Sequence, residues 1–331
     1  PLTRLSACPM WSQMNLFSDY RRCSDRPPSA VAIGNFDGVH CGHQALLAAV
    51  RSWSTGHRCM PTVLTFDPHP IRLFAPHVEL SVITSLDERV ALLSHYGIEQ
   101  TLAQTFDRTF AALSPEAFAR KVLVNALNAQ RVVVGYDFRF GAGRAGQLSD
   151  LKKFGSEMGF DVVVIDAVQR GEGSVISSTA IRTALDTGAV EQAQLMLGRP
   201  YHVHGVVVQG EQRGTALGYP TANIATDVPP LVANGVYGGW LDFGEGAHAA
   251  VANVGHNPTF GADRTRTFEV HVLDADGLDL YGKTVRFWHH ARIRPEQRFD
   301  DVSDLIDQIQ RDCLQTKHVL RQAERPPELG R

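Results

Sequence analysis

Hydrophobic and polar positions in the first half of the chain follow two alternating patterns. Short apolar runs, typical of strands buried on both faces, occur at Ala30–Ile33, Thr62–Phe66, Gln100–Ala103, Arg131–Val134 and Asp161–Ile165. Between them, stretches of helical periodicity lie near residues 43–55, 87–96, 115–128 and 147–158. In the first of these, an apolar stripe is formed by Leu46, Ala49, Val50 and Trp53. This alternation predicts a doubly wound, Rossmann-like α/β domain with a parallel sheet, whose ligands bind at the carboxyl ends of the strands.

The pattern changes near Gly198. Beyond it, short strand-like runs separated by turn residues occur at Tyr201–Gln209, Gly235–Phe243, Ala249–Val254, Thr265–Leu273 and Lys283–Ile293. Such spacing predicts a small antiparallel β-barrel. A final apolar stripe predicts a terminal helix, with Val302, Leu305, Ile306 and Ile309 on one face. The expected organisation is an N-terminal extension (1–28), an α/β domain (29–185), a barrel domain (186–323) and a tail (324–331).

Composition narrows the class of protein. The chain has 331 residues, of which 44% are hydrophobic and 20% charged, as in ordinary globular proteins of two domains. A formal charge of −3 argues against a nucleic-acid partner. No apolar run is long enough to span a bilayer, and residues 1–28 lack the apolar core of a secretion signal. Five scattered cysteines suit a reducing cytosol. We therefore expect a cytoplasmic protein with small-molecule partners, its oligomeric state left open.

A glycine-rich turn follows the first predicted strand. It runs from Gly34 to His43 and leads directly into a helix. Glycines at such a turn let backbone N–H groups approach a phosphate, and the helix N-terminus adds positive potential. His40 and His43 place two imidazoles at the same turn, where they can donate hydrogen bonds to a polyphosphate. Cys41 beside them raises zinc as an alternative, but three ligands in one tight turn, with no second pair nearby, argue against a zinc site.

Two further segments have ambiguous patterns. The segment from Ser177 to Arg182 opens another helix, where Ser and Thr would serve as caps. A cation in the first helical turn opposes the helix dipole, so Arg182 makes better sense beside a bound anion.

The segment from Gly141 to Gly146 matches G-x-G-x-x-G, with Asp161 twenty residues past Gly141. Because this match does not follow its strand directly, it fits a loop beside the site better than a NAD fingerprint.

The barrel half carries a second set of candidates. A glycine-rich loop ends in Thr221 and Asn223, whose oxygen-bearing side chains lie on the same side of an extended chain and could share one hard cation. Such stretches are also commonly plain turns. Further on, Phe268, Val270 and Val272 alternate with Glu269 and His271, which predicts a half-buried strand with one polar face. On pattern alone, Glu269 could equally be a solvated surface acid.

Together these segments resemble one family, the bacterial bifunctional riboflavin kinase/FMN adenylyltransferases. In the α/β half the resemblance rests on the segments Gly34–His43, Thr65–Pro70, Gly135–Gly141 and Ser177–Arg182. In the barrel half it rests on Leu197–Tyr201, Gly210–Asn223, Asn253–Phe260, Glu269–His271 and Asp279–Gly282. The resemblance covers roughly residues 30–315 and implies formation of FMN and then FAD from riboflavin with ATP and Mg²⁺. It also implies that residues 29–185 form the adenylyltransferase domain and 186–323 the riboflavin kinase domain.

The resemblance also implies roles for individual residues. For adenylylation, His40, His43 and Arg182 act on the ATP phosphates, together with Gly34, Phe36, Asp37, Gly42, Ser177, Ser178 and Thr179. The ATP and flavin pocket is shaped by Asp67, Asp137 and Phe140. For the kinase, Gly214 and Gly218 bind phosphate, Thr221 and Asn223 hold Mg²⁺–ATP, and Glu269 is the general base.

The chain departs from the family at two positions. Thr215 and Asn257 stand where many members have arginine, so phosphate contacts in the kinase site could be weaker. Two other functions stay open: a paralogue that acts on a modified flavin or another nucleotide, and a flavin-binding regulator without turnover. The histidine pair and Glu269 argue against the regulator, because binding alone does not need a general base.

Overall fold

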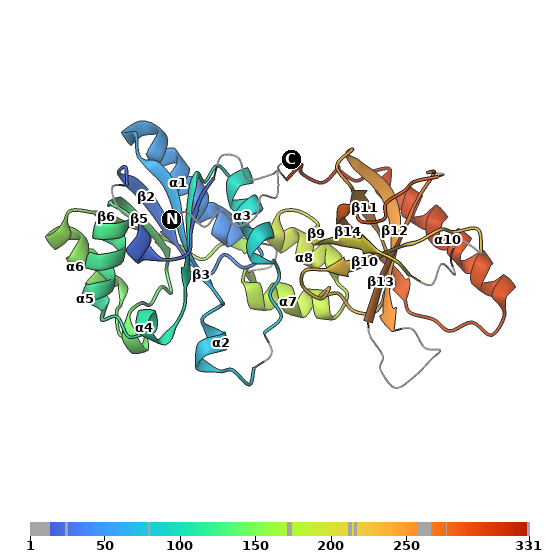
Figure 1. Ribbon diagram of the computed structural model, residues 1–331, viewed down its shortest axis with the longest axis horizontal. Coiled ribbons are helices and arrows are strands. Elements are labelled where there is room, and N and C mark those ends of the chain that lie inside the picture. The colour runs from blue at the N-terminus through green and yellow to red at the C-terminus, as the bar shows by residue number, and fades with distance from the viewer. Residues whose placement is uncertain are drawn as a thin grey trace. The chain divides into compact units, whose positions relative to one another are not determined.

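The computed structural model describes residues 14–23, 26–78, 80–170, 174–210, 214, 217–256, 266–275 and 277–329. The chain divides into two compact units (Figure 1). The first comprises Pro1–Val82, Leu86–Ile176 and Leu329–Arg331, and the second Ile83–Ser85 and Ser177–Glu328. Within the described residues, no helix is both long and apolar enough to cross a membrane.

The first unit is built on a six-stranded sheet in which every neighbouring pair is parallel. Its order is β1 (Asn15–Phe17), β4 (Gln100–Thr105), β3 (Met60–Asp67), β2 (Ser29–Ile33), β5 (Ala129–Gly135) and β6 (Asp161–Ile165). The parallel α/β fold and its five predicted strands are confirmed. The edge strand β1 is new, and it lies within the stretch expected to be an extension.

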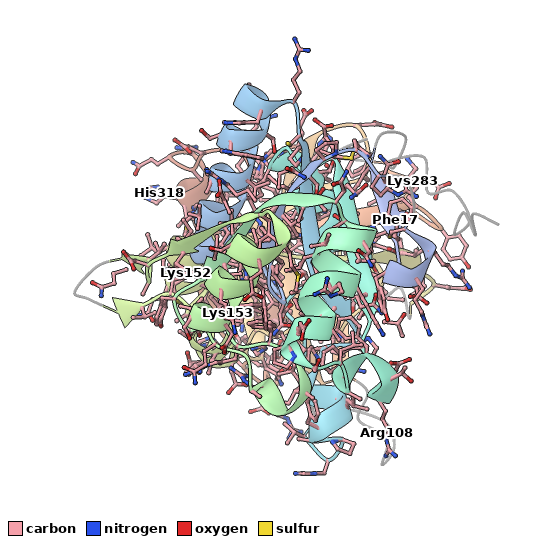
Figure 2. The ribbon with its side chains drawn as sticks, turned by 90° about the vertical axis from the view of Figure 1, so that its left-hand side faces the viewer. Phe17, Arg108, Lys152, Lys153, Lys283 and His318 are labelled. Carbon is pink, nitrogen blue, oxygen red and sulfur yellow. The ribbon has the colours of Figure 1, made fainter. Side chains whose placement is uncertain are left out.

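Helices connect these strands. The predicted helices correspond to α1 (Cys41–His57), α3 (Leu86–His95), α6 (Leu148–Met158) and, near residues 115–128, α5 (Pro115–Phe118) followed by the π-helix η2 (Ala119–Ala126). Smaller elements that the pattern did not predict are η1 (Tyr20–Arg22), α2 (Ile71–Phe74), α4 (Arg108–Ala111), η3 (Ala142–Arg144), β7 (Gln169–Arg170) and β8 (Ser174–Val175). The exposed Lys152 and Lys153 mark the solvent side of α6 (Figure 2).

Both faces of the central strand β2 are covered, since all five of its residues are buried. Val31 and Ile33 share a core with Val122 and Leu123 of η2. The helix α1 packs on β2, β3 and β5. Its buried residues are Leu46, Leu47, Val50 and Ser54 rather than the predicted stripe through Ala49 and Trp53. The ring of Trp53 instead stays half-buried beneath the guanidinium of Arg131, 4.7 Å from the ring centroid.

The second unit contains a closed antiparallel barrel, as the sequence predicts. The strand order is β10 (Ala222–Thr226), β13 (Arg266–Val272), β12 (Ala247–His256), β11 (Gly235–Asp242), β14 (Thr284–Pro295) and β9 (Tyr201–Val208), which pairs with β10 to close the ring. The described residues of the unit form the helices α7 (Ser178–Asp186), α8 (Val190–Leu197) and the terminal α10 (Val302–Leu320). The strand β10 is an addition to the predicted set.

The core of the second unit joins the barrel to the helices before it. Ile181 and Leu185 of α7 are fully buried with barrel residues, and Ile83 joins the same cluster. Inside the barrel lies a completely buried imidazole, that of His289 on β14. Its ring centroid lies 5.3 Å from those of both Tyr201 and Tyr237. Burial lowers the pKa of His289 to about 3, so this ring is neutral at physiological pH.

The terminal helix is present as predicted, but its buried face is different. Val302 is 60% exposed, so the predicted stripe is wrong at its first position. The buried face includes Asp312, which is 3% exposed. Nη2 of Arg294 on β14 lies 2.9 Å from a carboxylate oxygen of Asp312. This ion pair explains how an acidic residue can face the barrel.

Candidate functional site

The glycine-rich turn after β2 has an unusual backbone. Phe36 and Val39, both fully buried, have φ angles of 51° and 41°, and Gly38 between them has φ 81°. Side-chain-bearing residues rarely adopt positive φ, so packing must hold this conformation in place. The turn also carries Asp37, which is 1% exposed. A strained, buried backbone at the carboxyl end of a parallel strand is where the fold places its ligands.

His40 caps the helix that follows. It is the N-cap of α1, and its Nδ1 accepts a hydrogen bond from the backbone N–H of His43 at 3.3 Å. Because Nδ1 acts as acceptor, the proton of the neutral ring is on Nε2, which is the tautomer that can donate to a phosphate. The rings of His40 and His43 are stacked, with centroids 3.6 Å apart. At Gly42, a Cβ atom would lie 3.1 Å from the His40 ring, so glycine leaves room for this cap.

The acidic candidates of the first unit lie at the same sheet edge. Asp67 is the last residue of β3, and Asp137 follows the end of β5 by two residues. The exposed Asp137 has Oδ1 3.3 Å from the position that a Cβ on Gly135 would take. Phe140 differs from these, because it is 5% exposed and packs in the core against Phe118, with ring centroids 5.5 Å apart. Three of the predicted loops therefore share one edge of the sheet.

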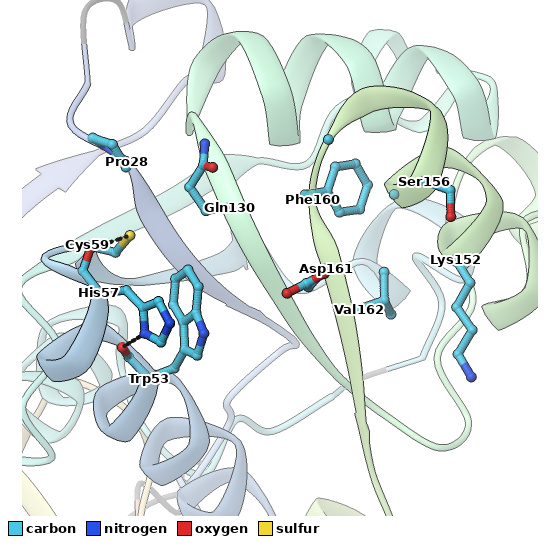
Figure 3. A pocket seen from close by; sticks show the side chains of 12 residues that line it. Pro28, Trp53, His57, Cys59, Gln130, Lys152, Ser156, Phe160, Asp161 and Val162 are labelled. Atoms are coloured by element: carbon cyan, nitrogen blue, oxygen red, sulfur yellow. Dashed lines mark hydrogen bonds between the residues drawn. The ribbon is translucent and has the colours of Figure 1, made fainter.

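A cavity of about 740 Å³ lies elsewhere on the first unit (Figure 3). Its lining includes Pro28, Cys59, Gln130 and Asp161, each of which lies within one residue of the start of β2, β3, β5 or β6. These positions are at the amino ends of the strands. The cavity is thus on the edge opposite the glycine-rich turn, and none of the predicted site residues lines it.

The start of α7 carries four predicted phosphate ligands. Ser177 is the N-cap, and its hydroxyl accepts a hydrogen bond from the N–H of Ala180 at 3.2 Å. Ser178 and Thr179 form the first turn, followed by the half-buried Arg182. Ser177 therefore has the capping role that its residue type favours. Because α7 belongs to the second unit, its joint action with His40 and His43 stays a prediction.

In the second unit, two glycines pack against the predicted metal ligands. A Cβ on Gly210 would lie 2.0 Å from Nδ2 of Asn223, and one on Gly214 would lie 3.0 Å from Oγ1 of Thr221. The carbonyl of Gly214 also accepts hydrogen bonds from the N–H groups of Leu217 (3.1 Å) and Tyr219 (2.8 Å), while Gly218 has φ 84°. Larger residues at Gly210 or Gly214 would displace these side chains. The glycines of the loop therefore leave room for the side chains of Thr221 and Asn223.

Glu269 lies beside these ligands in the barrel. On β13 it is paired with Asn223 of β10 on one side and with Asn253 of β12 on the other. Phe268 and Val270 are buried, whereas Glu269 is half-buried, so the predicted alternation of the strand is confirmed. Sequence reasoning assigned no role to Asn253, although strand register alone places it next to Glu269.

A second residue that sequence reasoning missed is His271. It follows Glu269 on the same face of β13. Its Nδ1 lies 2.8 Å from the carbonyl oxygen of Pro220, to which it can donate a hydrogen bond. The ring also meets that of Tyr219, with centroids 5.5 Å apart. His271 therefore fixes the segment directly before Thr221 against the strand of Glu269.

Known proteins resemble both units. The family model described as FAD synthetase matches residues 23–180, and the one described as riboflavin kinase matches residues 197–320. The bifunctional riboflavin kinase/FMN adenylyltransferase of Escherichia coli K12 is 38% identical over 304 residues, covering 91% of this chain and 96% of the relative. The chain belongs to this bifunctional family.

A second bifunctional relative supports the same assignment, and one solved structure shares the fold. The bifunctional riboflavin kinase/FMN adenylyltransferase of Listeria monocytogenes is 34% identical over 89% of this chain and 93% of its own. A crystal structure described as a macrolide-efflux protein from Streptococcus pneumoniae matches with a TM-score of 0.83 and 31% identity, over 94% of this chain and 99% of that one. Two departures from the family pattern, Thr215 and Asn257, lie outside the described residues.

Proposed function

We propose that this chain makes FAD from riboflavin in two ATP-dependent steps, with the kinase in the barrel and the adenylyltransferase in the α/β unit. The observation that carries the proposal is the strand register that sets Asn223 opposite Glu269. This register sets a carboxamide and a carboxylate on one face of the barrel, which supports their proposed roles as metal ligand and base in phosphate transfer to an alcohol. The proposed catalytic domains are residues 29–185 for adenylylation and 186–323 for phosphorylation.

Phosphorylation needs a base. The ribityl hydroxyl of riboflavin must lose a proton as it attacks the γ-phosphorus of ATP, and Glu269 accepts that proton. The glycine loop with Gly214 and Gly218 covers the phosphates, and Thr221 and Asn223 supply a hydroxyl and a carbonyl oxygen. Oxygen ligands of this kind fit Mg²⁺. When bound, Mg²⁺ neutralises phosphate charge in the transferring group.

Adenylylation has different needs. The phosphate of FMN is already an anionic nucleophile, so no protein base is required for attack on the α-phosphorus. The reaction still needs the two substrates to be aligned and the charge of the leaving pyrophosphate to be stabilised. We assign these roles to His40, His43 and Arg182. The backbone of the turn (Gly34, Phe36, Asp37, Gly42) and the start of α7 (Ser177, Ser178, Thr179) bind the triphosphate. The pocket for ATP and flavin is shaped by Asp67, Asp137 and Phe140.

The test is a multiple-turnover assay. The full chain is incubated with riboflavin, ATP and Mg²⁺, and the products are separated by chromatography. We expect FMN to appear first, with ADP, and FAD later, with pyrophosphate; EDTA should stop both steps. Binding of riboflavin without release of ADP or pyrophosphate would support the regulator instead. Turnover of a flavin analogue in preference to riboflavin would support the paralogue.

A further inference from the structure

A buried positive charge lies in the first unit outside the predicted site residues. Arg89 on α3 is 3% exposed. Burial lowers the pKa of Arg89 from its ordinary value, and the charges of Asp37 and Asp67 oppose that shift. A guanidinium stays protonated in proteins, so the charge is retained. Burying a charge is costly, and apolar side chains of similar volume often serve stability as well or better.

The contacts of Arg89 join two loops that the site needs. Its Nη1 donates to the carbonyl of Asn35 at 3.2 Å, to the carbonyl of Phe66 at 3.1 Å and to the hydroxyl of Thr65 at 3.2 Å. The Thr65 hydroxyl in turn donates to the carbonyl of Asn35 at 2.9 Å. Asn35 belongs to the glycine-rich turn after β2, whereas Phe66 is at the end of β3. One nitrogen atom therefore fixes the spacing between these two segments.

The same two segments carry acidic site residues. Asp37 lies two residues after Asn35, and Asp67 directly follows Phe66. All three acceptors of Arg89 are neutral oxygens, so its charge acts on Asp37 and Asp67 through space. Interactions across a poorly hydrated interior are stronger than on the surface. The buried positive charge of Arg89 therefore acts on two acidic residues beside a site that must also accept the triphosphate.

We propose that Arg89 is a positioning residue for adenylylation: it holds the turn with Asp37, His40 and His43 at a fixed spacing from Asp67. The inference rests on the adenylylation activity proposed above. Arg89 needs no contact with substrate for this role. Its loss should misalign ATP relative to the FMN phosphate, and misplacement by about 1 Å can cost about 10²-fold in rate.

The bifunctional chain supplies its own folding control. We would measure kcat and KM of both activities in full-length Arg89→Met and Arg89→Lys. For Arg89→Met, we expect kcat of adenylylation to fall about 10²-fold, with the KM for FMN changed less than about threefold. Arg89→Lys keeps the charge without the planar fork and should recover part of the loss. Riboflavin phosphorylation should match the wild type in both variants.

Arg131→Met is the matched control, because Arg131 is on β5 at the amino edge of the sheet, where it pairs with Asp161. Adenylylation in this variant should be normal. The proposal is wrong if Arg89→Met keeps adenylylation within threefold of wild type. Thermal unfolding measures the folded fraction of each variant. The proposal is equally wrong if the adenylylation lost by Arg89→Lys and Arg89→Met is no larger than the fraction of protein that has unfolded. A wild-type chain that makes no FAD from FMN would instead refute the proposed function.

A double variant tests the coupling to Asp67. If Arg89 acts by placing Asp67, the two residues are coupled and their effects do not add. The adenylylation rate of the double variant Arg89→Met/Asp67→Asn should then lie no more than about threefold below that of the less active single variant. Independent multiplication of the two losses would overturn the positioning role.

Discussion

Asn223 of β10 lies directly opposite Glu269 of β13, in the register that closes one side of the barrel. Side chains paired across antiparallel strands point to the same face, with Cβ atoms about 5 Å apart. The proposed metal ligand and the proposed base therefore approach one substrate from neighbouring strands. A shift of β10 by a single residue would turn Asn223 to the other face and separate them.

Replacement of Glu269 by Gln tests the base directly. Gln keeps the size and hydrogen bonding of Glu but cannot accept the proton, so we expect FMN formation to fall about 10²- to 10⁴-fold. Binding of riboflavin and adenylylation of added FMN should survive. Glu245→Gln, at an exposed position beyond β11, is the matched control. Near-normal kinase turnover in Glu269→Gln would reduce Glu269 to a surface acid.

Substitution of the stacked histidines tests the phosphate turn. His40→Ala or His43→Ala should lower FAD formation from FMN about 10²-fold, the scale of losing one preorganised donor. His40→Asn separates catalysis from capping, because Asn is a good N-cap and should restore stability but not activity. His57→Ala, at the far end of the same helix, should leave the rate unchanged. Parallel loss of riboflavin phosphorylation would indicate misfolding rather than a phosphate role.

The two activities should be separable in fragments, with a boundary that follows the core. Residues 177–331 retain α7, whose Ile181 and Leu185 are fully buried, whereas residues 186–331 lose both. The shorter fragment also loses the carbonyl of Leu185, which accepts from the N–H of Ala233 at 3.0 Å. Removal of a buried aliphatic side chain typically costs about 2–5 kcal/mol.

We therefore expect residues 177–331 to phosphorylate riboflavin and to melt at a clearly higher temperature than residues 186–331. Thermal unfolding followed by circular dichroism makes the comparison. Equal melting temperatures would show that α7 adds nothing to the barrel. A folded fragment 177–331 that binds riboflavin and forms no FMN would contradict the assignment of the kinase to the second unit.

Stability of the barrel should depend on pH through His289. Its folded pKa of about 3 lies below the ordinary value of 6.5, so between these values the unfolded state binds the extra proton. Stability is then complete above about pH 6.5 and falls as pH drops toward 3, by up to about 1.4 kcal/mol per pH unit. In His289→Leu this contribution should vanish. Urea unfolding of residues 177–331, followed by the fluorescence of Trp240 and Trp288, measures how the free energy of unfolding changes with pH in the wild type and in His289→Leu. Identical slopes in the two would show that His289 does not cause the pH dependence.

The fold was largely predictable because each domain repeats its own pattern: strands alternate with helices in the first, and short strands alternate with turns in the second. The run Asp161–Ile165 identified a parallel strand to the residue, although this edge strand is only half-buried. The strand β10 was missed, since only Ile224 among its residues is buried and its alternation is too short to register. The face of α10 was missed for a different reason. A pattern counts Asp312 as exposed, whereas in the fold its carboxylate pairs with Arg294 from a distant strand and accepts a hydrogen bond from Gln308.

The candidate site was predictable only where residues adjoin in sequence. The turn around His40 and the loop before Asn223 are continuous segments, so their residue types suffice to suggest phosphate and metal binding. Arg89 and His271 act across the fold, on carbonyls 23 to 54 and 51 residues away in the chain. A backbone carbonyl has no residue type, so no sequence pattern records such a bond.

Ile83 is buried in the core of the second unit, although the chain on both sides of it belongs to the first. No single cut in the gene therefore yields two complete domains. A kinase fragment that begins at residue 177 therefore lacks one side chain of its core. During synthesis, Ile83 leaves the ribosome long before the barrel does. The core of the second unit, which forms last, therefore closes on a residue that was made together with the first unit. Exchange of barrels between relatives should succeed best when residues 83–85 are exchanged with them.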